Sequence, residues 1–599
     1  NRPFALGGNP LFDYDSSEGP RNYDGFRASA GFRGDFSDSL SWDVAATYME
    51  QNATRDGRDT VVNRYQLALR GLGGPNCNIA ANTPGLNGCF WYNPFNNAIP
   101  ANGITGVANS QFNPALANDN PELIDWMFPV VSTEQQTTIM VIDAVLSGET
   151  GIDLPGGALG WAAGAQYRED TFEATYSDLN NFAVTPCVNS VSTGIVGPGA
   201  CTPAQLAAPT GALLFLGGAA DRDLDRDVSA VFFELSLPIT DSFQAQLAAR
   251  YEDYGSGIGD TFDPKLSLRW QLVDSFALRG SVGTTFRGPA LQQADPNSVT
   301  SLQNVAGTFR AIRTFGNPNL QPESALTFNV GMLAKAGGFT GSIDYWSFDF
   351  EDQLVNEPVA GITNFVFGTG ATCIGGLANP LAGRFSFRDG NNDGVINDAD
   401  CTTANIARLD INVFNGPNVK TDGIDVSAQF DWEIGGGTAA IGLNATYVLK
   451  YDIDATFVGG NQVSAAFDAA GKLNYQTTAY PLPQLKGNVF AEYSNGAHNI
   501  RYTMNYIDDY TDQRVAEFLP TLATNGIAIT AGKTIDSTMF HDLSYLVQLP
   551  WDTSLSLTVE NLTDEDPSFA RLDLSYDPFT SSALGRTYKV GLRKRFSAE

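Results

Sequence analysis

The stretch Pro264–Pro289, PKLSLRWQLVDSFALRGSVGTTFRGP, decides the fold. Its first half alternates strictly between apolar and polar side chains. The apolar positions are Leu266, Leu268, Trp270 and Leu272, and the polar positions are Lys265, Ser267, Arg269 and Gln271. Because successive side chains of a strand point to opposite faces, one face of this strand is apolar. A tight turn at 273–275 and a second alternating run then predict a β-hairpin.

The same unit recurs along nearly the whole chain, and short turns alternate with long loops. We expect about 17 antiparallel strands between residues 22 and 596, after an entering loop at 1–21 and before a tail at 597–599. The long loops are expected at 51–132, 177–226, 290–324, 357–421, 453–483, 513–537 and 564–585. Strands of about ten residues with short turns at one end and long loops at the other are typical of an all-β transmembrane barrel of the outer membrane.

Aromatic residues near the strand ends favour this barrel over a soluble sandwich or solenoid, because aromatic girdles mark both membrane interfaces. They include Trp42, Tyr48, Tyr251, Trp270, Tyr345, Trp346, Tyr447 and Tyr545. An odd strand count conflicts with the even number in single-chain bacterial barrels, and an open edge leaves backbone groups unsatisfied in lipid. We therefore expect the first strands to lie before Asn1.

Composition excludes several classes of protein. The formal net charge is −31, from 35 basic and 66 acidic residues, which argues against a nucleic-acid partner. Aromatic residues make up 11% of the chain, which argues against disorder. The sequence contains no apolar run long enough for a transmembrane helix, which needs about 18 residues.

Six cysteines fall into three local pairs inside loops rich in Gly, Asn and Pro: Cys77 with Cys89, Cys187 with Cys201, and Cys373 with Cys401. An even count in short brackets predicts disulfides formed in an oxidising compartment. Zinc binding is the weaker interpretation, because the chain has two histidines, His498 and His541.

Four short segments and the chain end resemble the β-barrel of TonB-dependent outer-membrane receptors. They are Phe286, Arg287 and Pro289 in TFRGP (285–289); Asn317, Pro318, Pro322 and Glu323 in GNPNLQPE (316–323); KTDGID (420–425); Asn561 in VENLTD (559–564); and Phe596 in the terminal strand. Two departures concern the end: Phe596 is followed by three further residues, and Lys594 stands where an apolar residue is usual. The segments occur in the family's order along the chain.

The resemblance implies a barrel of about 22 strands with a plugged lumen. The plug, its energy-coupling box and the first strands have no counterpart in this sequence. It further implies the outer membrane of a Gram-negative bacterium, contact with lipid and lipopolysaccharide, insertion by the barrel-assembly machinery, and energy from TonB–ExbB–ExbD acting on the plug. No chemistry on the substrate is implied.

The segment DGNNDGVINDAD (389–400) has oxygen-bearing side chains at the spacing of a calcium loop. The candidate ligands are Asp389, Asn391, Asp393, Val395 (through its carbonyl), Asn397 and Asp400. Asp400 at the last position is shorter than the usual Glu, as in the dockerin-type loops that this stretch resembles. A structural calcium ion is the hypothesis, and an acidic surface turn is the alternative.

Nothing in the sequence predicts catalysis. His541 begins a strand and His498 follows a turn, so both are expected to be structural. Loop aromatics Phe90, Trp91, Tyr92 and Phe95 could stack on a ligand or pack the loop, and packing is favoured for a loop that bears a disulfide.

The favoured function is a receptor that imports a scarce nutrient: a carbohydrate or oligosaccharide, another organic ligand or a metal chelate, with carbohydrate slightly ahead. The alternatives are a structural or adhesive barrel with calcium-stabilised loops and, less favoured, an outer-membrane hydrolase.

Overall fold

The structure, a computed structural model, describes residues 19–93, 101, 106–110, 112, 120–188, 201–207, 209–214, 216–255, 257–391, 393–475, 477–514, 531–572 and 574–596. Among these residues, no helix has the length and apolar composition to span a membrane. Phe95 and the tail at 597–599 lie outside the described residues.

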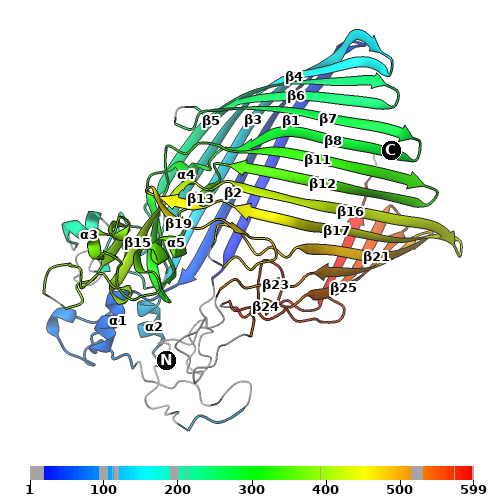
Figure 1. Cartoon of the computed structure of the whole chain (residues 1–599). Helices are drawn as coiled ribbons and strands as arrows, with labels where there is room; N and C mark the ends of the chain where they lie inside the picture. Colours follow the sequence, from blue (N-terminus) through cyan, green and yellow to red (C-terminus); the bar gives the residue numbers. More distant parts are fainter. Residues whose placement is uncertain are drawn as a thin grey trace.

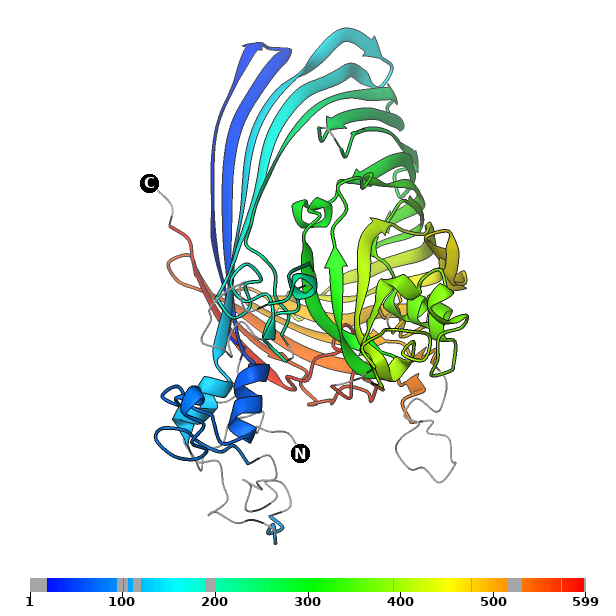
Figure 2. The same cartoon turned by 90° about the vertical axis from the view of Figure 1, so that its left-hand side faces the viewer.

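One curved antiparallel sheet of 18 strands forms the body of the protein, and, apart from one two-residue strand, each strand pairs with the next along the meander (Figures 1 and 2). Its members are β1 (Arg21–Ser37), β2 (Leu40–Arg58), β3 (Val130–Leu154), β4 (Gly157–Tyr176), β5 (Arg222–Thr240), β6 (Phe243–Asp253), β7 (Asp260–Val273), β8 (Phe276–Arg287), β11 (Glu323–Ala336), β12 (Phe339–Glu351), β16 (Val419–Ile434), β17 (Gly437–Ile453), β20 (Phe467–Asp468), β21 (Leu485–Asn495), β22 (His498–Ile507), β25 (Thr538–Leu549), β26 (Thr553–Glu560) and β27 (Thr587–Lys594). Strand β20 is only two residues long and lies beside the end of β17. The other 17 strands correspond to the 17 strands that the sequence predicts. Within the described residues, β1 pairs with β2 alone and β27 with β26 alone.

The hairpin that decides the fold is β7–β8. Leu266 faces Val282 across the pair and Trp270 faces Leu278, so apolar side chains line up on one face. Trp270 remains 48% exposed, which places this face against lipid in a membrane. The alternation also corrects one expectation: Tyr345 and Trp346 cannot both lie in an outer girdle. Trp346 lies on the face of Asp344, opposite the lipid face.

Glycine makes room for an ion pair on the inner face. The Asp344 carboxylate accepts two hydrogen bonds from Arg279, at 2.7 and 2.5 Å, and lies directly over Gly331 of the strand between them. A Cβ atom at Gly331 would lie 1.9 Å from Asp344 Oδ1. The pair therefore depends on the missing side chain.

Replacing Gly331 with alanine is expected to displace Asp344 and lower the free energy of unfolding by about 1–3 kcal/mol. Gly160→Ala is the matched control, because its added Cβ would meet Ser236 Cβ at an ordinary 3.6 Å. Thermal unfolding in detergent, followed by tryptophan fluorescence, measures both. Equal transitions for the two variants would contradict the packing argument.

Several predicted strand ends are wrong, because the length of a strand is set by its pairing with neighbouring strands and not by the thickness of the membrane alone. Strand β2 continues to Arg58, eight residues into the loop expected from residue 51, since β3 on its other side starts at Val130. Residues 352–356, expected to continue a strand, leave the sheet, and Leu354–Asn356 form β13 in a separate sheet. Strand β22 likewise ends at Ile507 rather than 512.

Three long loops fold together into one compact unit, here called the first outer body, at the loop end of the sheet (Figure 1). It contains β9 (Ser298–Val305), β10 (Thr308–Phe315), β13, β14 (Phe385–Phe387), β15 (Ile406–Asn415), the hairpin β18–β19 (Thr456–Val458, Asn461–Ser464) and helix α5 (Val359–Phe367). Its buried core includes Ile312, Ile362, Leu409 and Val458. Because β10 and β15 pair in parallel, segments about a hundred residues apart are joined.

A second outer body packs around Leu473, Tyr510, Ile535 and Ala570, with short strands β23 (Tyr510–Thr511) and β24 (Thr534–Ile535). Burial and a hydrogen bond to Asp577 (2.6 Å) raise the pKa of Tyr510. The other helices also lie in the long loops: α1 (Val62–Leu69), α2 (Pro121–Met127), α3 (Pro203–Ala207), α4 (Leu291–Ala294), and the 3-10 turns Ile79–Ala81, Gly376–Ala378, Ala382–Arg384 and Thr403–Asn405. Of these, α4 and the last three 3-10 turns lie in the loops that form the first outer body.

Candidate ligand-binding site

A cavity of about 610 Å³ lies where the sheet meets the two outer bodies. Its walls come from the ends of β8, β11 and β17, from β9, β13 and β15 of the first outer body, and from residues 477–480 beside the second. Small-molecule sites are concave and about 300–1,000 Å³ in volume, so the cavity has the size of a ligand site.

Two of the predicted motif residues meet in the wall of this cavity. Arg287, at the end of β8, pairs in register with Glu323, at the start of β11. The Arg287 guanidinium donates a hydrogen bond of 2.8 Å to Glu323 Oε2, which also accepts one from the backbone N–H of Leu354 (3.0 Å). Glu323 therefore ties the sheet to β13 of the first outer body. The sequence located both residues but could not show that they form a pair.

A second carboxylate, that of Glu357, lies deeper in the same wall. Its side chain is 6% exposed and accepts hydrogen bonds from Arg384 (2.8 Å) and from the backbone N–H of Asn412 (2.9 Å). The sequence gave no signal for Glu357, because its partners lie 27 and 55 residues away in the same loop.

The opposite wall is the segment Thr477–Tyr480. The amide of the buried Asn474 holds it by donating hydrogen bonds to the carbonyls of Ala469, Lys472 and Tyr480, at 2.9 to 3.1 Å. The Tyr480 ring is exposed and lies 5.2 Å from that of Phe579.

The other motif residues shape the chain around the site. Pro289 accepts a hydrogen bond of 2.6 Å at its carbonyl from Arg226, and Phe286 packs edge-on against Tyr254. Asn317 caps its own turn by accepting from the N–H of Asn319, the turn that leads through Pro318 and Pro322 to Glu323. These contacts explain the motifs as structural anchors.

The last motif residues lie near the end of the chain. Asn561 holds the turn after β26 through two hydrogen bonds with the backbone of Glu565, at 2.8 and 2.9 Å. Phe596 follows β27 and is 87% exposed. The three predicted cysteine pairs, Cys77–Cys89, Cys187–Cys201 and Cys373–Cys401, are disulfides in the structure.

The predicted calcium loop lies on the surface of the first outer body. Asp389 accepts hydrogen bonds from the N–H groups of Asp393 and Gly394, Asp400 from those of Gly390 and Asn397, and Asn391 donates to Asp393. Val395 is exposed. Across the described residues, no group of three or more His, Cys, Asp or Glu is placed to hold a metal ion. The carboxylates thus serve the turn itself, and calcium binding stays a prediction.

Both histidines lie on the lipid face of the sheet. His498 Nδ1 lies 2.6 Å from the hydroxyl of Tyr545, and His541 Nδ1 lies 2.6 Å from that of Tyr502, each across the pair β22–β25. The loop aromatics also have structural roles: Tyr92 is buried with α1 and α2, and Phe90 packs against the same core, whereas Trp91 is 57% exposed.

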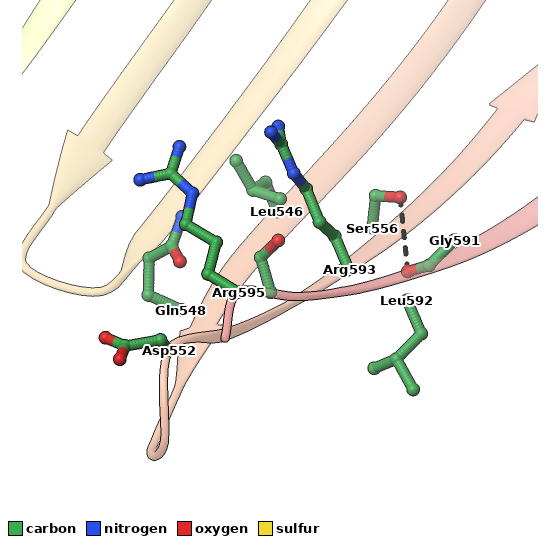
Figure 3. Close-up of a pocket in the computed structure, with 9 residues that line it drawn as sticks. Leu546, Gln548, Asp552, Ser556, Gly591, Leu592, Arg593 and Arg595 are labelled. Carbon is green, nitrogen blue, oxygen red and sulfur yellow. Dashed lines mark hydrogen bonds between the residues drawn. The ribbon is translucent and has the colours of Figure 1, made fainter. Parts of the chain in front are cut away.

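A second cavity, of about 580 Å³, lies at the short-turn end of the sheet (Figure 3). Arg593 and Arg595 point to one side of the last strand, and Leu592 points to the other. This cavity is far from the outer bodies, so we assign the ligand site to the cavity at the loop end.

Solved structures of similar fold are siderophore receptors. The chain aligns with the siderophore receptor PirA of Acinetobacter baumannii at 14% identity and a TM-score of 0.53, covering 98% of this chain and 66% of that one. It aligns with a mutant of the ferric enterobactin receptor of Pseudomonas aeruginosa at 14% identity and a TM-score of 0.53, covering 96% of this chain and 62% of that one. These likenesses show the fold, and the chain spans less than two thirds of each.

Curated relatives match over shorter stretches. The iron-regulated outer membrane virulence protein of Vibrio cholerae is 27% identical over 128 residues, which are 21% of this chain and 18% of that protein. The ferrienterobactin receptor of Escherichia coli is 22% identical over 130 residues, 21% of this chain and 17% of that protein.

The family described as TonB dependent receptor-like, beta-barrel, matches residues 1–562. Its members are outer-membrane proteins of Gram-negative bacteria, and they are receptors and transporters rather than enzymes. The chain therefore belongs to the TonB-dependent receptor β-barrel family of the outer membrane.

Proposed function

We propose that the protein binds an iron–siderophore chelate at the cell surface and imports it, with energy supplied by TonB, ExbB and ExbD. The cavity at the loop end carries the proposal, because its walls come from the sheet, from the first outer body and from the segment 477–480. The names of the relatives favour an iron chelate over the carbohydrate and over the adhesive role that the sequence left open.

Ligand capture and transport are separable in this proposal. The first outer body has a buried core of its own, so the cavity wall that it forms is held in shape before a ligand arrives. Such preorganisation lowers the entropic cost of binding. Transport then requires coupling to the inner membrane, which the cavity itself does not provide.

Uptake of radiolabelled ferric siderophores by a strain that lacks the gene, with and without the native full-length protein restored, tests the proposal. We expect uptake to require the protein and TonB. Because Thr478 lines the cavity, the bulky side chain of Thr478→Trp should fill it and lower the affinity for the ferric siderophore at least about tenfold. The same change at the exposed Thr372, outside the cavity, should not. Uptake that is unchanged without the gene would contradict the proposal.

A further inference from the structure

Each charged side chain that lines the cavity at the loop end is paired with a side chain of opposite charge. Among the described residues that line it, Arg287 is the one cation, and Glu323 and Glu357 are the carboxylates. Arg287 is bound to Glu323 at 2.8 Å, and Glu357 is bound to Arg384, which stands behind the wall, at 2.8 Å. Among these described residues, a ligand that enters the cavity therefore meets no lining cation without a carboxylate partner.

The rest of the polar lining is uncharged. Amide, hydroxyl and phenol groups come from every wall and can both donate and accept hydrogen bonds. They belong to Gln293, Gln303, Gln353, Asn356, Thr477, Thr478, Tyr451 and Tyr480. Such a lining matches a ligand rich in amide, hydroxyl or carbonyl oxygen, and it offers no charge to replace the water around an anion.

Two cations elsewhere in the first outer body are paired with a carboxylate, and a third is bound to backbone carbonyls. Arg313 and Arg408 both bind Asp410 in the first outer body, and Arg310 donates to the carbonyls of residues 403 and 404. The whole chain carries a formal charge of −31, so its long-range field repels anions and attracts cations. Local pairing and the overall field thus act in the same direction.

We propose that the cavity selects an electrically neutral or cationic iron chelate, of the hydroxamate class, over a polyanionic one of the catecholate class. This inference rests on the proposed function and adds the charge of its ligand. A ferric tris-hydroxamate is neutral, because its ligand charges cancel those of the metal, whereas a ferric tris-catecholate keeps a large negative charge. Bringing that anion between Glu323 and Glu357 costs desolvation without a compensating cation.

Binding of gallium complexes of one tris-hydroxamate and one tris-catecholate siderophore to the native full-length protein in detergent tests the inference. Titration calorimetry at two salt concentrations measures both affinities. The tris-hydroxamate is expected to bind at least about tenfold more tightly. Thr478→Lys, which adds a cation to the lining, should raise the affinity for the tris-catecholate about tenfold and so narrow the difference between the two affinities. Thr372→Lys adds the same charge on the outer surface and should leave the ratio of affinities unchanged.

Tighter binding of the tris-catecholate by the wild-type protein would overturn the inference and leave the proposed function intact. An equal response of the ratio to Thr478→Lys and Thr372→Lys would also overturn it, because the selection would then come from the overall field and not from the cavity. Binding of neither complex would overturn the proposed function together with the inference.

Discussion

Replacing Asp512 with alanine is expected to unfold the second outer body while the barrel sheet stays intact. The Asp512 side chain is fully buried and accepts hydrogen bonds from Arg514 (2.7 Å) and Arg571 (2.9 Å), whose side chains are 14% and 5% exposed. Removing the carboxylate takes a buried, charged hydrogen-bond acceptor away from two buried guanidinium groups. Breaking a buried ion pair in this way costs about 3–5 kcal/mol.

Hydrogen exchange, read by mass spectrometry, measures this effect where it is expected. Residues 469–475, 510–514 and 569–572 should lose protection, and strands β7 and β8 should keep it. Asp509→Ala is the matched control, since Asp509 is an exposed aspartate in the same loop, three residues earlier. Full protection of the second outer body in the Asp512→Ala protein would show that packing alone holds it.

The same ion cluster gives the second outer body a pH dependence with a defined sign. Burial acts to raise the pKa of Asp512, but hydrogen bonds from Arg514 and Arg571 outweigh it and lower the pKa below its ordinary value. A carboxyl whose pKa is lowered on folding contributes stability above its unfolded pKa of about 3.9, and this contribution is lost as the pH falls through the folded value. The difference between wild type and Asp512→Ala should therefore shrink below about pH 4.

The sheet was predictable because its signal is local. A period of two in Leu266–Leu272, followed by a short turn, identifies a hairpin without knowledge of any distant residue. The ends of the strands were not predictable to the same accuracy, because β2 and β3 extend each other beyond the membrane through backbone pairing that needs no apolar side chains. Residues 50–58 of β2 are mostly polar, so the alternation of apolar and polar side chains stops several residues before the strand ends.

The candidate site was predictable only as separate pieces. Arg287 and Glu323 stood out as motif residues, but their pairing depends on the register of β8 and β11. Glu357 and Thr478 belong to no motif. Glu357 reaches the cavity because β13 pairs with β15, and Thr478 reaches it because Asn474 fixes the segment 477–480. Contacts between residues far apart in sequence leave no periodic signal, so the first outer body, with its parallel pair β10–β15, was expected only as loops.

Removing the disulfide Cys373–Cys401 is expected to loosen the first outer body and, with it, the wall of the ligand cavity. The bond closes a span of 28 residues. By lowering the entropy of the unfolded chain, a bond of this span is expected to stabilise the fold by about 3–4 kcal/mol. Cys401 is fully buried and its carbonyl accepts the N–H of Cys373 (2.9 Å), so the bond lies against the core that holds α5 and β15.

In the double variant Cys373→Ser and Cys401→Ser, β15 and α5 should lose hydrogen-exchange protection, and the affinity for a bound chelate should fall because Glu357 and Ile411 of the cavity wall follow the same core. The matched control removes Cys187–Cys201, a bond of similar type with a span of 14 residues in another loop. It should cost stability in that loop and leave the affinity unchanged. If both double variants lowered the affinity equally, the effect would come from general loosening of the loops, and the first outer body could not be the part that shapes the site.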